Sequence, residues 1–326
     1  MLIEAEKPVS PVSRLTEPRT IVSFAVAAIV LYFLFSRIEF DRILEVIGDA
    51  RPGYIAAAAV MYFGSLPIRG ERWRLLLNNI GVRAGLKDAS EIFLLSWFAN
   101  TLVPAKMGDV YRGYLAKKAW NVSISKCFGT VYVERIYDVL VLVILMGVSS
   151  IMVFGTDIPQ AIKVSLALGF AILVLLISVV VAFSSGKTTI ANKLPSKIQP
   201  MFTQFAEGLH ESAGRSSVVL IILYTILIWS MEVARLYFVV ESLSPLHNIH
   251  IGLSLIVFVA LSAALVSALP ITPSGLGAVE FAIVGVFVLV GVDAGVAAGI
   301  AILDRAISYW GLMAVGAVVY MVSEKK

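Results

Sequence analysis

Long apolar runs fill most of this chain, and they restrict its fold more than any other feature. They cover residues 20–36, 53–68, 89–103, 124–154, 161–183, 216–240, 251–269, 278–292 and 294–322. Hydrophobic residues make up 59% of the sequence and charged residues 15%, whereas about 25% of a soluble domain is charged. The mean hydropathy is +0.91. Because about twenty apolar residues form one helical span of a bilayer, the sequence predicts an all-α polytopic membrane protein.

The Lys and Arg residues between the runs predict the orientation of the chain. Segments 69–88 and 184–215 are rich in Lys and Arg, whereas segments 155–160 and 241–250 contain neither. Since cytoplasmic loops carry the excess of positive charge, the first two segments are expected inside and the other two outside. The net charge of +4 is explained by these loops, so nucleic-acid binding is not expected.

Two regions with short apolar runs are expected to enter the membrane and return. The orientations predicted by the loop charges are consistent with one another if residues 89–120 enter the membrane from the cytoplasm, turn at Pro104 and return to the same side. By the same argument, residues 251–292 enter from outside and turn between Pro270 and Gly277. The chain then has about six full transmembrane helices and two re-entrant helical hairpins. The alternative is that the second hairpin crosses fully, which gives eight to nine membrane segments.

A short motif occurs twice, once in each expected hairpin. It reads Pro-x-x-[Met/Leu]-Gly-[Asp/Ala]-Val and begins at Pro104 and at Pro273. An acid followed by Arg comes thirty residues after the first proline and thirty-one after the second, as Glu134-Arg135 and Asp304-Arg305. Each unit contains three crossings, an odd number, so the second unit is expected upside down relative to the first. This is the inverted-topology repeat of many membrane transporters.

These patterns predict a single integral membrane domain over residues 20–322. The expected parts are a cytoplasmic tail (1–19), repeat one (about 20–154), repeat two (about 161–322) and a second cytoplasmic tail (323–326). Within repeat two, the cytoplasmic linker 184–215 has apolar residues at helical spacing among charged ones. It is expected to form an amphipathic helix at the inner surface of the membrane.

Charged residues inside the apolar regions are candidates for function, because a charge near the bilayer centre costs roughly 2.5–3.5 kcal/mol. Glu134, Arg135 and Asp138 fall within one 100-degree arc of a helix, so they can face a common cavity. The alternative is a self-neutralised ion cluster that holds the helices together.

The residues after the first proline form a second candidate group. Lys106, Asp109 and Arg112 are expected at the N-terminal end of the helix that returns from the first hairpin. Free amide groups and two cations there suit a phosphate or another anionic head group. The alternative is that the cations extend to the inner surface of the membrane.

In the second hairpin, Gly275 and Gly277 permit a tight turn, and Glu280 is the single charge in the next apolar stretch. Glu280 is expected to meet Arg305 or Arg235. Glu232 and Arg235, three residues apart on one helix, are interpreted as a structural pair. The candidate substrate-binding residues are Lys106, Asp109, Arg112, Glu134, Arg135, Asp138, Glu280, Asp304 and Arg305, with Arg72, Glu232 and Arg235 as secondary candidates.

The sequence predicts no catalytic residue, no cofactor and no metal site. The single cysteine, Cys127, excludes an intramolecular disulfide framework and any metal site with several cysteines. His247 and His250 are interpreted as polar loop residues, because two histidines without a third ligand rarely hold a metal.

Several of these motifs together resemble the flippase-like transmembrane domain of lysylphosphatidylglycerol synthases and its stand-alone relatives. The resemblance covers about residues 20–322. It rests on Arg72-Trp73, on Glu134-Arg135 with Asp138, on Glu280, and on the expected hairpin breaks Asn100, Pro104, Gly108, Pro270, Pro273, Gly275 and Gly277. Some members of this family carry an aminoacyl-transfer domain, and some relatives a glycosyltransferase. This chain shows neither, so synthase activity is not expected.

The resemblance and the charge pattern together suggest a lipid flippase or transporter of the cell membrane. It would move an anionic or modified lipid, a phospholipid or a lipid-linked sugar, between leaflets through a polar cavity at the midplane. Two alternatives stay open, a membrane enzyme acting on a lipid phosphate and an accessory subunit that presents lipid to a partner synthase or glycosyltransferase. The sequence does not predict the oligomeric state.

Overall fold

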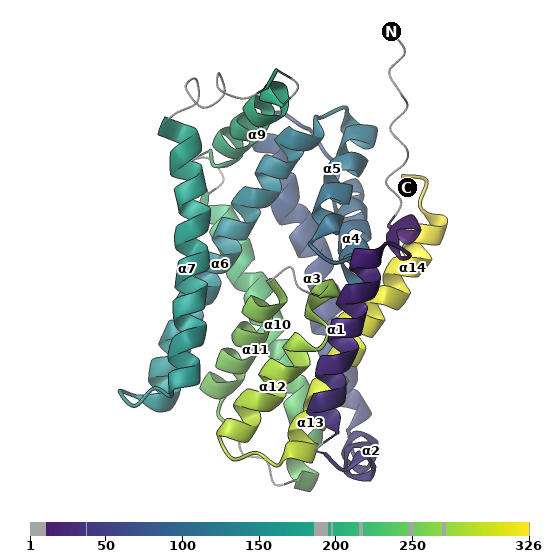
Figure 1. Ribbon diagram of the computed structural model, residues 1–326, viewed down its shortest axis with the longest axis vertical. Coiled ribbons are helices and arrows are strands. Elements are labelled where there is room, and N and C mark those ends of the chain that lie inside the picture. The colour runs from purple at the N-terminus through teal and green to yellow at the C-terminus, as the bar shows by residue number, and fades with distance from the viewer. Residues whose placement is uncertain are drawn as a thin grey trace.

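The computed structural model describes residues 11–36, 38–185, 195–196, 198–214, 218–247, 251–268 and 272–325, and in these residues it contains helices and loops without strands (Figure 1). The helices are α1 (Pro18–Phe35), α2 (Phe40–Gly48), α3 (Pro52–Asn79), α4 (Leu86–Leu102), α5 (Met107–Trp120), α6 (Ile124–Phe154), α7 (Gln160–Ser185), α9 (Gln199–Ser212), α10 (Val218–His247), α11 (Leu253–Ala268), α12 (Ala278–Leu289), α13 (Ala294–Arg305) and α14 (Leu312–Val322). A π-helical turn, Ala306–Gly311, joins α13 to α14.

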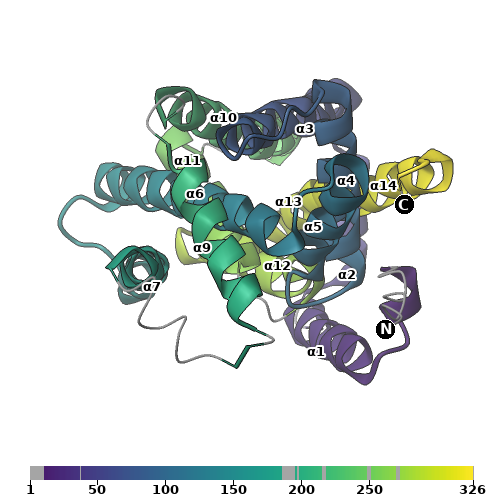
Figure 2. The same ribbon diagram turned by 90° about the horizontal axis from the view of Figure 1, so that it is seen from above.

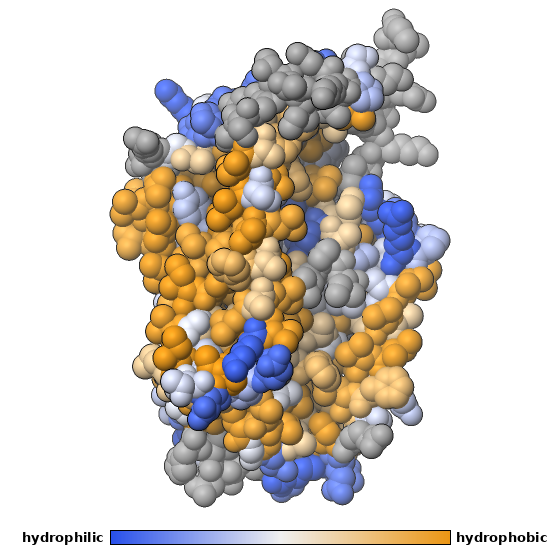
Figure 3. Space-filling view, turned by 60° about the vertical axis from the view of Figure 1, so that its left-hand side comes forward, coloured by the Kyte–Doolittle hydropathy of each residue, from blue (hydrophilic) through white to orange (hydrophobic). Residues whose placement is uncertain are grey.

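Within the described ranges, five helical segments are long and apolar enough to cross a membrane. They are Pro18–Phe35, Ile124–Phe154, Ile162–Phe183, Val218–Ser244 and Ala294–Val322. Helix α3 is also 28 residues long, but its second half carries four charged residues. Hydrophobic side chains cover most of the middle of the face shown in Figure 3. The protein is therefore an all-α polytopic membrane protein, which confirms the fold class predicted from the sequence.

The long helices run between two ends of the molecule. The end of α14 and helix α9 lie at one end, and the turn between α6 and α7 lies at the other (Figure 1). Seen from above, α3 and α10 pack side by side, while α1 and α7 lie at the periphery of the opposite side (Figure 2). Most apolar side chains of α7 are exposed, as expected of a helix that faces lipid.

Two helical hairpins, α4–α5 and α11–α12, occupy opposite halves of the molecule in Figure 1. Helix α4 ends at Leu102 and α5 begins at Met107, so the break falls on the first proline motif. The second hairpin turns through the short 3-10 segment Pro273–Gly275, which packs against α4. The tip of the second hairpin therefore lies against the first hairpin. Pro270, another expected break, lies outside the described residues.

The two turns share an unusual backbone conformation. Ala105 and Lys106 have φ angles of 60° and 55°, and Ser274 and Gly275 have φ angles of 45° and 72°. These are the second and third residues of the two copies of the motif. Left-handed backbone is unfavourable for residues other than glycine, so two consecutive left-handed residues at matched positions extend the sequence repeat into the structure.

Close packing fixes the first hairpin. Gly108, in the first turn of α5, faces α4 so closely that an added Cβ atom would lie 2.0 Å from the backbone oxygen of Ser96. The end of the described chain also contacts this hairpin, since Lys325 pairs with Asp88 at 2.8 Å and with Glu91 near the start of α4. Burial alone would lower the pKa of the Lys325 ammonium, but its hydrogen bonds to the two carboxylates raise that pKa above its ordinary value.

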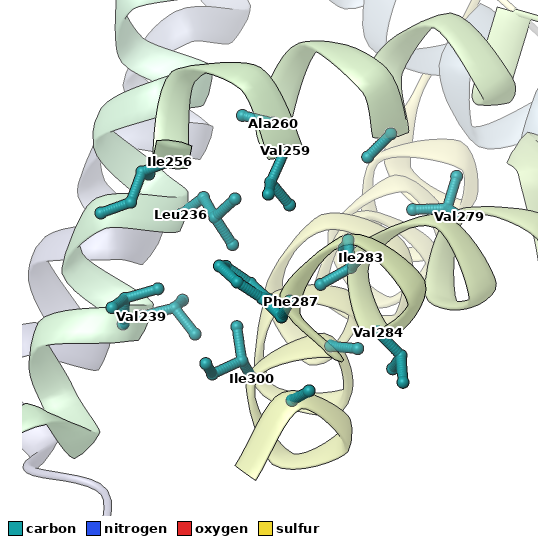
Figure 4. Packing of buried hydrophobic residues seen from close by; sticks show 14 of the residues in the cluster. Leu236, Val239, Ile256, Val259, Ala260, Val279, Ile283, Val284, Phe287 and Ile300 are labelled. Atoms are coloured by element: carbon teal, nitrogen blue, oxygen red, sulfur yellow. The ribbon is translucent and has the colours of Figure 1, made fainter. Parts of the chain in front are cut away.

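A hydrophobic core fixes the second hairpin. Phe287 of α12 is fully buried among side chains of its neighbours, which include Leu236 of α10, Val259 of α11 and Ile300 of α13 (Figure 4). Lipid tails are as apolar as these side chains, so close packing, more than removal from water, holds helices together in a membrane. This core packs the two helices of the hairpin against α10 and α13.

Helix α9 lies in the 184–215 linker, where the sequence predicts an amphipathic helix. Its buried face packs along α6, where Gly208 approaches so closely that a Cβ atom would lie 2.1 Å from the backbone oxygen of Lys126. Lys126 also pairs with Glu211 of α9 at 2.7 Å. The linker helix is thus fastened to the start of α6.

Candidate functional site

A cavity of about 160 Å³ lies between the two hairpin turns and the long helices around them. Its polar lining comes from α3, α4, α6, α10, α11, α13 and both turns. The polar and aromatic lining residues are Tyr62, Arg69, Trp97, Asn100, Lys106, Arg135, Asp138, Trp229, Glu232, Arg235, Ser267, Ser274, Asp304, Arg305 and Ser308. Of the nine candidate substrate-binding residues, five line this cavity: Lys106, Arg135, Asp138, Asp304 and Arg305.

Arg72 is the centre of the ion network behind the first hairpin. Its guanidinium is fully buried and donates hydrogen bonds to Asp138 at 2.6 and 3.1 Å and to Glu134 at 3.0 Å. Arg112, also fully buried, donates to the other oxygen of Glu134 at 2.9 Å and lies over the ring of Phe93. Glu134 and Arg112 are therefore held inside the protein, away from the cavity lining, and Arg72 neutralises two acids at once.

Arg135 and Lys106 are held less tightly. Arg135 lies 3.3 Å from Asp109 and 3.7 Å from Asp138, and its side chain is 29% exposed. Among the described residues, no carboxylate oxygen lies within 4.0 Å of the Lys106 ammonium. Asp109 does not line the cavity, but it contributes to it by holding Arg135. These two neighbouring cations are the ones best placed to meet an anion in the cavity.

The start of α5 differs in one respect from the expectation of free amide groups. The backbone N–H of Gly108 already donates to the side-chain oxygen of Asn100 at 2.8 Å, and the amide nitrogen of Asn100 lies 3.4 Å from Asp109. Asn100 was predicted as a break in the hairpin, but it lies inside α4 near its end, and its side chain caps the start of α5. The favourable charge for an anion comes mainly from the two cations.

Glu280 meets Arg305, one of its two expected partners. The Arg305 Nε atom donates to Glu280 at 3.0 Å, and Glu280 accepts a second hydrogen bond, at 2.7 Å, from the backbone of Gly277. Arg305 also donates to the backbone oxygen of Ser274 at 3.1 Å. Arg305 and Glu280 thus fix the turn of the second hairpin from both sides.

Glu232 lies between two arginines on separate helices. Arg235 is 2.9 Å from Glu232 and 3.0 Å from Asp304, and Arg69 of α3 donates to the other oxygen of Glu232. The expected Glu232–Arg235 pair is present, and it belongs to a larger network that joins α3, α10 and α13.

The two halves of the chain contain the same two ion pairs at corresponding places. An arginine on the long helix before each hairpin pairs with an acid on the long helix after it: Arg72 with Glu134, and Arg235 with Asp304. The arginine next to that acid pairs with an acid in the first turn of the hairpin's second helix: Arg135 with Asp109, and Arg305 with Glu280. The repeat is thus present in contacts as well as in sequence.

One helix contacts the turns of both hairpins. Tyr309, in the π-helical turn after α13, donates a hydrogen bond at 3.1 Å to the backbone of Thr101 in the first hairpin. One turn earlier, Arg305 holds Ser274 in the second. Tyr62 of α3 donates at 2.8 Å to the backbone oxygen of Ser308 between them. Segments with π-helical hydrogen bonding often mark functional sites.

Sequence reasoning missed Arg69, Trp97 and Trp229, and it placed the secondary candidate Arg72 in a loop. Residues 69–88 were treated as a loop, but α3 continues to Asn79, and Arg69 and Arg72 are 3% and 0% exposed. The helix continues because buried carboxylates on α6 and α10 neutralise Arg69 and Arg72. The signal in the sequence was the three-residue spacing of these two arginines, which places both on one helix face. Trp97 and Trp229 gave no signal that separates a cavity residue from a core residue.

The charges of the whole network nearly balance. Six arginines and six carboxylates are paired by the contacts above in three neighbouring groups, and together they are called the network here: Arg69, Arg72, Arg112, Arg135, Arg235 and Arg305 with Asp109, Glu134, Asp138, Glu232, Glu280 and Asp304. Lys106 is the additional cation among the described residues of this region. Buried charges are tolerated when paired, so the network is a neutral scaffold to which Lys106 adds a charge of +1.

The fold and the site together define a polytopic helical membrane protein with an ion-lined cavity between two opposed helical hairpins. The family model of the lysylphosphatidylglycerol synthase TM region matches residues 20–316, and the chain belongs to this family. The resemblance drawn from the motifs is confirmed.

Curated relatives include both stand-alone and larger proteins. A UPF0104 membrane protein of Methanocaldococcus jannaschii is 36% identical over 230 residues, which cover 70% of this chain and 95% of that protein. Another, from Methanothermobacter thermautotrophicus, is 26% identical over 317 residues, or 90% of this chain and 91% of the relative. The glycosyltransferase AglD of Haloferax volcanii is 26% identical over 336 residues, but these cover 90% of this chain and 53% of AglD. This chain thus spans about half of AglD.

Proposed function

We propose that this protein is a lipid flippase or transporter that moves an anionic or modified lipid, a phospholipid or a lipid-linked sugar, between the leaflets of the cell membrane. The observation that carries the proposal is the position of Lys106. It is a cation with no carboxylate oxygen within 4.0 Å among the described residues, and it lines a cavity between two hairpin turns. An anionic head group would supply the missing negative charge.

The physical need for such a cavity comes from the membrane. A polar head group cannot cross hydrocarbon unaided, because its hydrogen bonds and charge have no partners there. The lining offers charged and hydrogen-bonding side chains at the level where the two hairpins meet. The acyl chains of the lipid would remain in the bilayer while the head group passes through the cavity.

The proposal includes two re-entrant hairpins with opposite entry. Helix α12 has 12 residues, which extend about 18 Å, and this is short of the roughly 30 Å of a hydrocarbon core. The first hairpin enters from the cytoplasm and the second from outside, in an inverted repeat. Both termini and α9 are then cytoplasmic.

A leaflet-exchange assay tests the function. The purified protein is reconstituted into phosphatidylcholine vesicles that contain a fluorescent phosphatidylglycerol, and dithionite is added to bleach the outer leaflet. If the protein exchanges lipid between leaflets, dithionite should bleach more of the fluorescent lipid than the share in the outer leaflet. Vesicles with Lys106→Gln protein should bleach like protein-free vesicles. Lys87→Gln, at an exposed site outside the cavity, is the matched control. If the wild-type protein leaves the inner leaflet protected for every anionic lipid tested, the proposed transport is wrong.

One relative favours a second candidate function. AglD is a glycosyltransferase about half of which matches this chain, so a lipid-presenting subunit beside a partner glycosyltransferase or synthase is the alternative. In that case the pure protein would bind a lipid-linked sugar without exchanging it. This role would be supported over transport if the pure protein binds the lipid without exchanging it, and if an added partner enzyme then turns over the bound lipid.

A further inference from the structure

The carboxylates of the cavity are already occupied by arginines. Asp138 accepts a hydrogen bond from Arg72 at 2.6 Å. Asp304 lies 3.0 Å from Arg235 in an ion pair whose geometry does not make a hydrogen bond. Glu232 contacts arginines on both sides. A primary amine that enters a dehydrated site needs a carboxylate to accept its charge. Each described lining carboxylate has an arginine within 3.0 Å, so an amine would have to share its acid with a buried arginine.

The cations of the same lining exceed its acids. Five basic side chains and three acidic ones face the cavity, a difference of +2: Arg69, Lys106, Arg135, Arg235 and Arg305 against Asp138, Glu232 and Asp304. The excess is concentrated at Lys106 and Arg135, because the other three arginines contact acids at 3.0 Å or less. A head group with negative charge is therefore attracted, and one with net positive charge is repelled.

Another part of the lining offers a neutral hydrogen-bond donor. The indole Nε1–H of Trp229 on α10 is buried and has no hydrogen-bond partner among the described residues. A buried donor without an acceptor is costly, and this one belongs to the cavity lining. It can donate to a hydroxyl or ring oxygen of a ligand, but it cannot neutralise an amine, since indole is a donor only.

From these three observations we infer the substrate class. The cavity takes a lipid phosphate joined to an uncharged, hydroxyl-bearing group such as glycerol or a sugar, with the phosphate at Lys106 and Arg135 and a hydroxyl oxygen at Trp229. It rejects head groups with a free amine, and in particular aminoacylated phosphatidylglycerol. The inference rests on the proposed function, because it names the lipid that the transporter would move.

Selectivity is tested by binding and by exchange. Binding of the purified protein is measured by native mass spectrometry with phosphatidylglycerol, a polyprenyl-phosphate sugar, phosphatidylethanolamine and lysylphosphatidylglycerol. Exchange of fluorescent versions is measured in phosphatidylcholine vesicles. The two amine-free lipids should bind and exchange at least about tenfold better than the two amine-bearing lipids. This is the difference expected when one charge-assisted hydrogen bond cannot form. Equal or stronger binding of lysylphosphatidylglycerol overturns the inference.

The two readouts separate the inference from the function on which it rests. Selective binding without any exchange supports the substrate class and refutes the proposed transport. Exchange of all four lipids at similar rates keeps the transporter and overturns the substrate class. A preference for the sugar lipid over phosphatidylglycerol, or the reverse, identifies which hydroxyl-bearing group is the natural one.

Variants test the two contacts one at a time. Trp229→Phe keeps the ring and removes the donor, so binding of phosphatidylglycerol should fall by about fivefold while phosphatidic acid, which lacks the hydroxyl group, is unaffected. Lys106→Glu changes the excess charge of the lining from +2 to zero and should raise lysylphosphatidylglycerol binding relative to phosphatidylglycerol. Trp310→Phe, 58% exposed, is the control. An equal loss of both lipids in Trp229→Phe, or an unchanged preference in Lys106→Glu, contradicts the assignment.

Discussion

Removing Arg72 should destabilise this protein far more than removing Lys106, although both are cations of the same region. Arg72 is fully buried and makes three hydrogen bonds of 2.6–3.1 Å to two carboxylates. In Arg72→Met, Glu134 keeps only Arg112 as a close partner, and Asp138 keeps only the 3.7 Å contact with Arg135. Stranding a buried charge in this way costs about 3–5 kcal/mol. Lys106→Met breaks no ion pair and should change stability by less than about 0.5 kcal/mol.

The assay is thermal unfolding of the detergent-purified protein, followed by tryptophan fluorescence and by monodispersity on size exclusion. Arg72→Met should lower the apparent Tm by on the order of 5–10 °C, and Lys106→Met should leave it unchanged. Neutralising a stranded acid, in Arg72→Met with Asp138→Asn, should recover part of the loss. If Arg72→Met unfolds at the wild-type temperature, the buried network is not what holds α3, α6 and the first hairpin together.

Further predictions follow from the same contacts. Gly108→Ala should destabilise the first hairpin by about 1–3 kcal/mol, because its Cβ would lie 2.0 Å from the Ser96 backbone oxygen; a wild-type Tm would refute the close packing. Lys106→Ala protein should remain folded and monodisperse but exchange anionic lipid at least about tenfold more slowly; normal exchange would return this residue to a structural role. Cysteines placed at Asp157 and at Met201, both exposed, should be labelled from opposite sides of the membrane, and labelling from one side would contradict the inverted repeat.

The sequence predicted the fold class well, because apolar length and loop charge report directly on spans. It also located both hairpin turns, since Pro104 and Pro273 interrupt helices whichever way the chain packs. It could not predict the end of α3. There, four charged residues look like a loop until the acids that neutralise them, Glu134, Asp138 and Glu232, are placed in space.

The candidate site was predicted less completely. A helical arc placed Glu134, Arg135 and Asp138 together, but it could not tell which of them face a cavity. That depends on Arg72 and Arg112, which come from two other helices and draw Glu134 away from the cavity. Periodicity within one helix carries no information about the partner helix, so the division into scaffold and lining was available only from the structure.

The left-handed turn of the first hairpin has a consequence for how this protein balances stability against activity. At the position of Lys106 the second hairpin has Gly275, the residue that adopts this backbone without strain. A non-glycine residue there costs roughly 1–2 kcal/mol, so Lys106→Gly should yield a chain that is more resistant to heat. The same chain would lack Lys106, which among the described residues of this region is the cation without a paired acid. Selection for thermal stability alone would therefore remove the lysine, and its presence marks a position where the protein tolerates strain in order to keep a charge in the cavity.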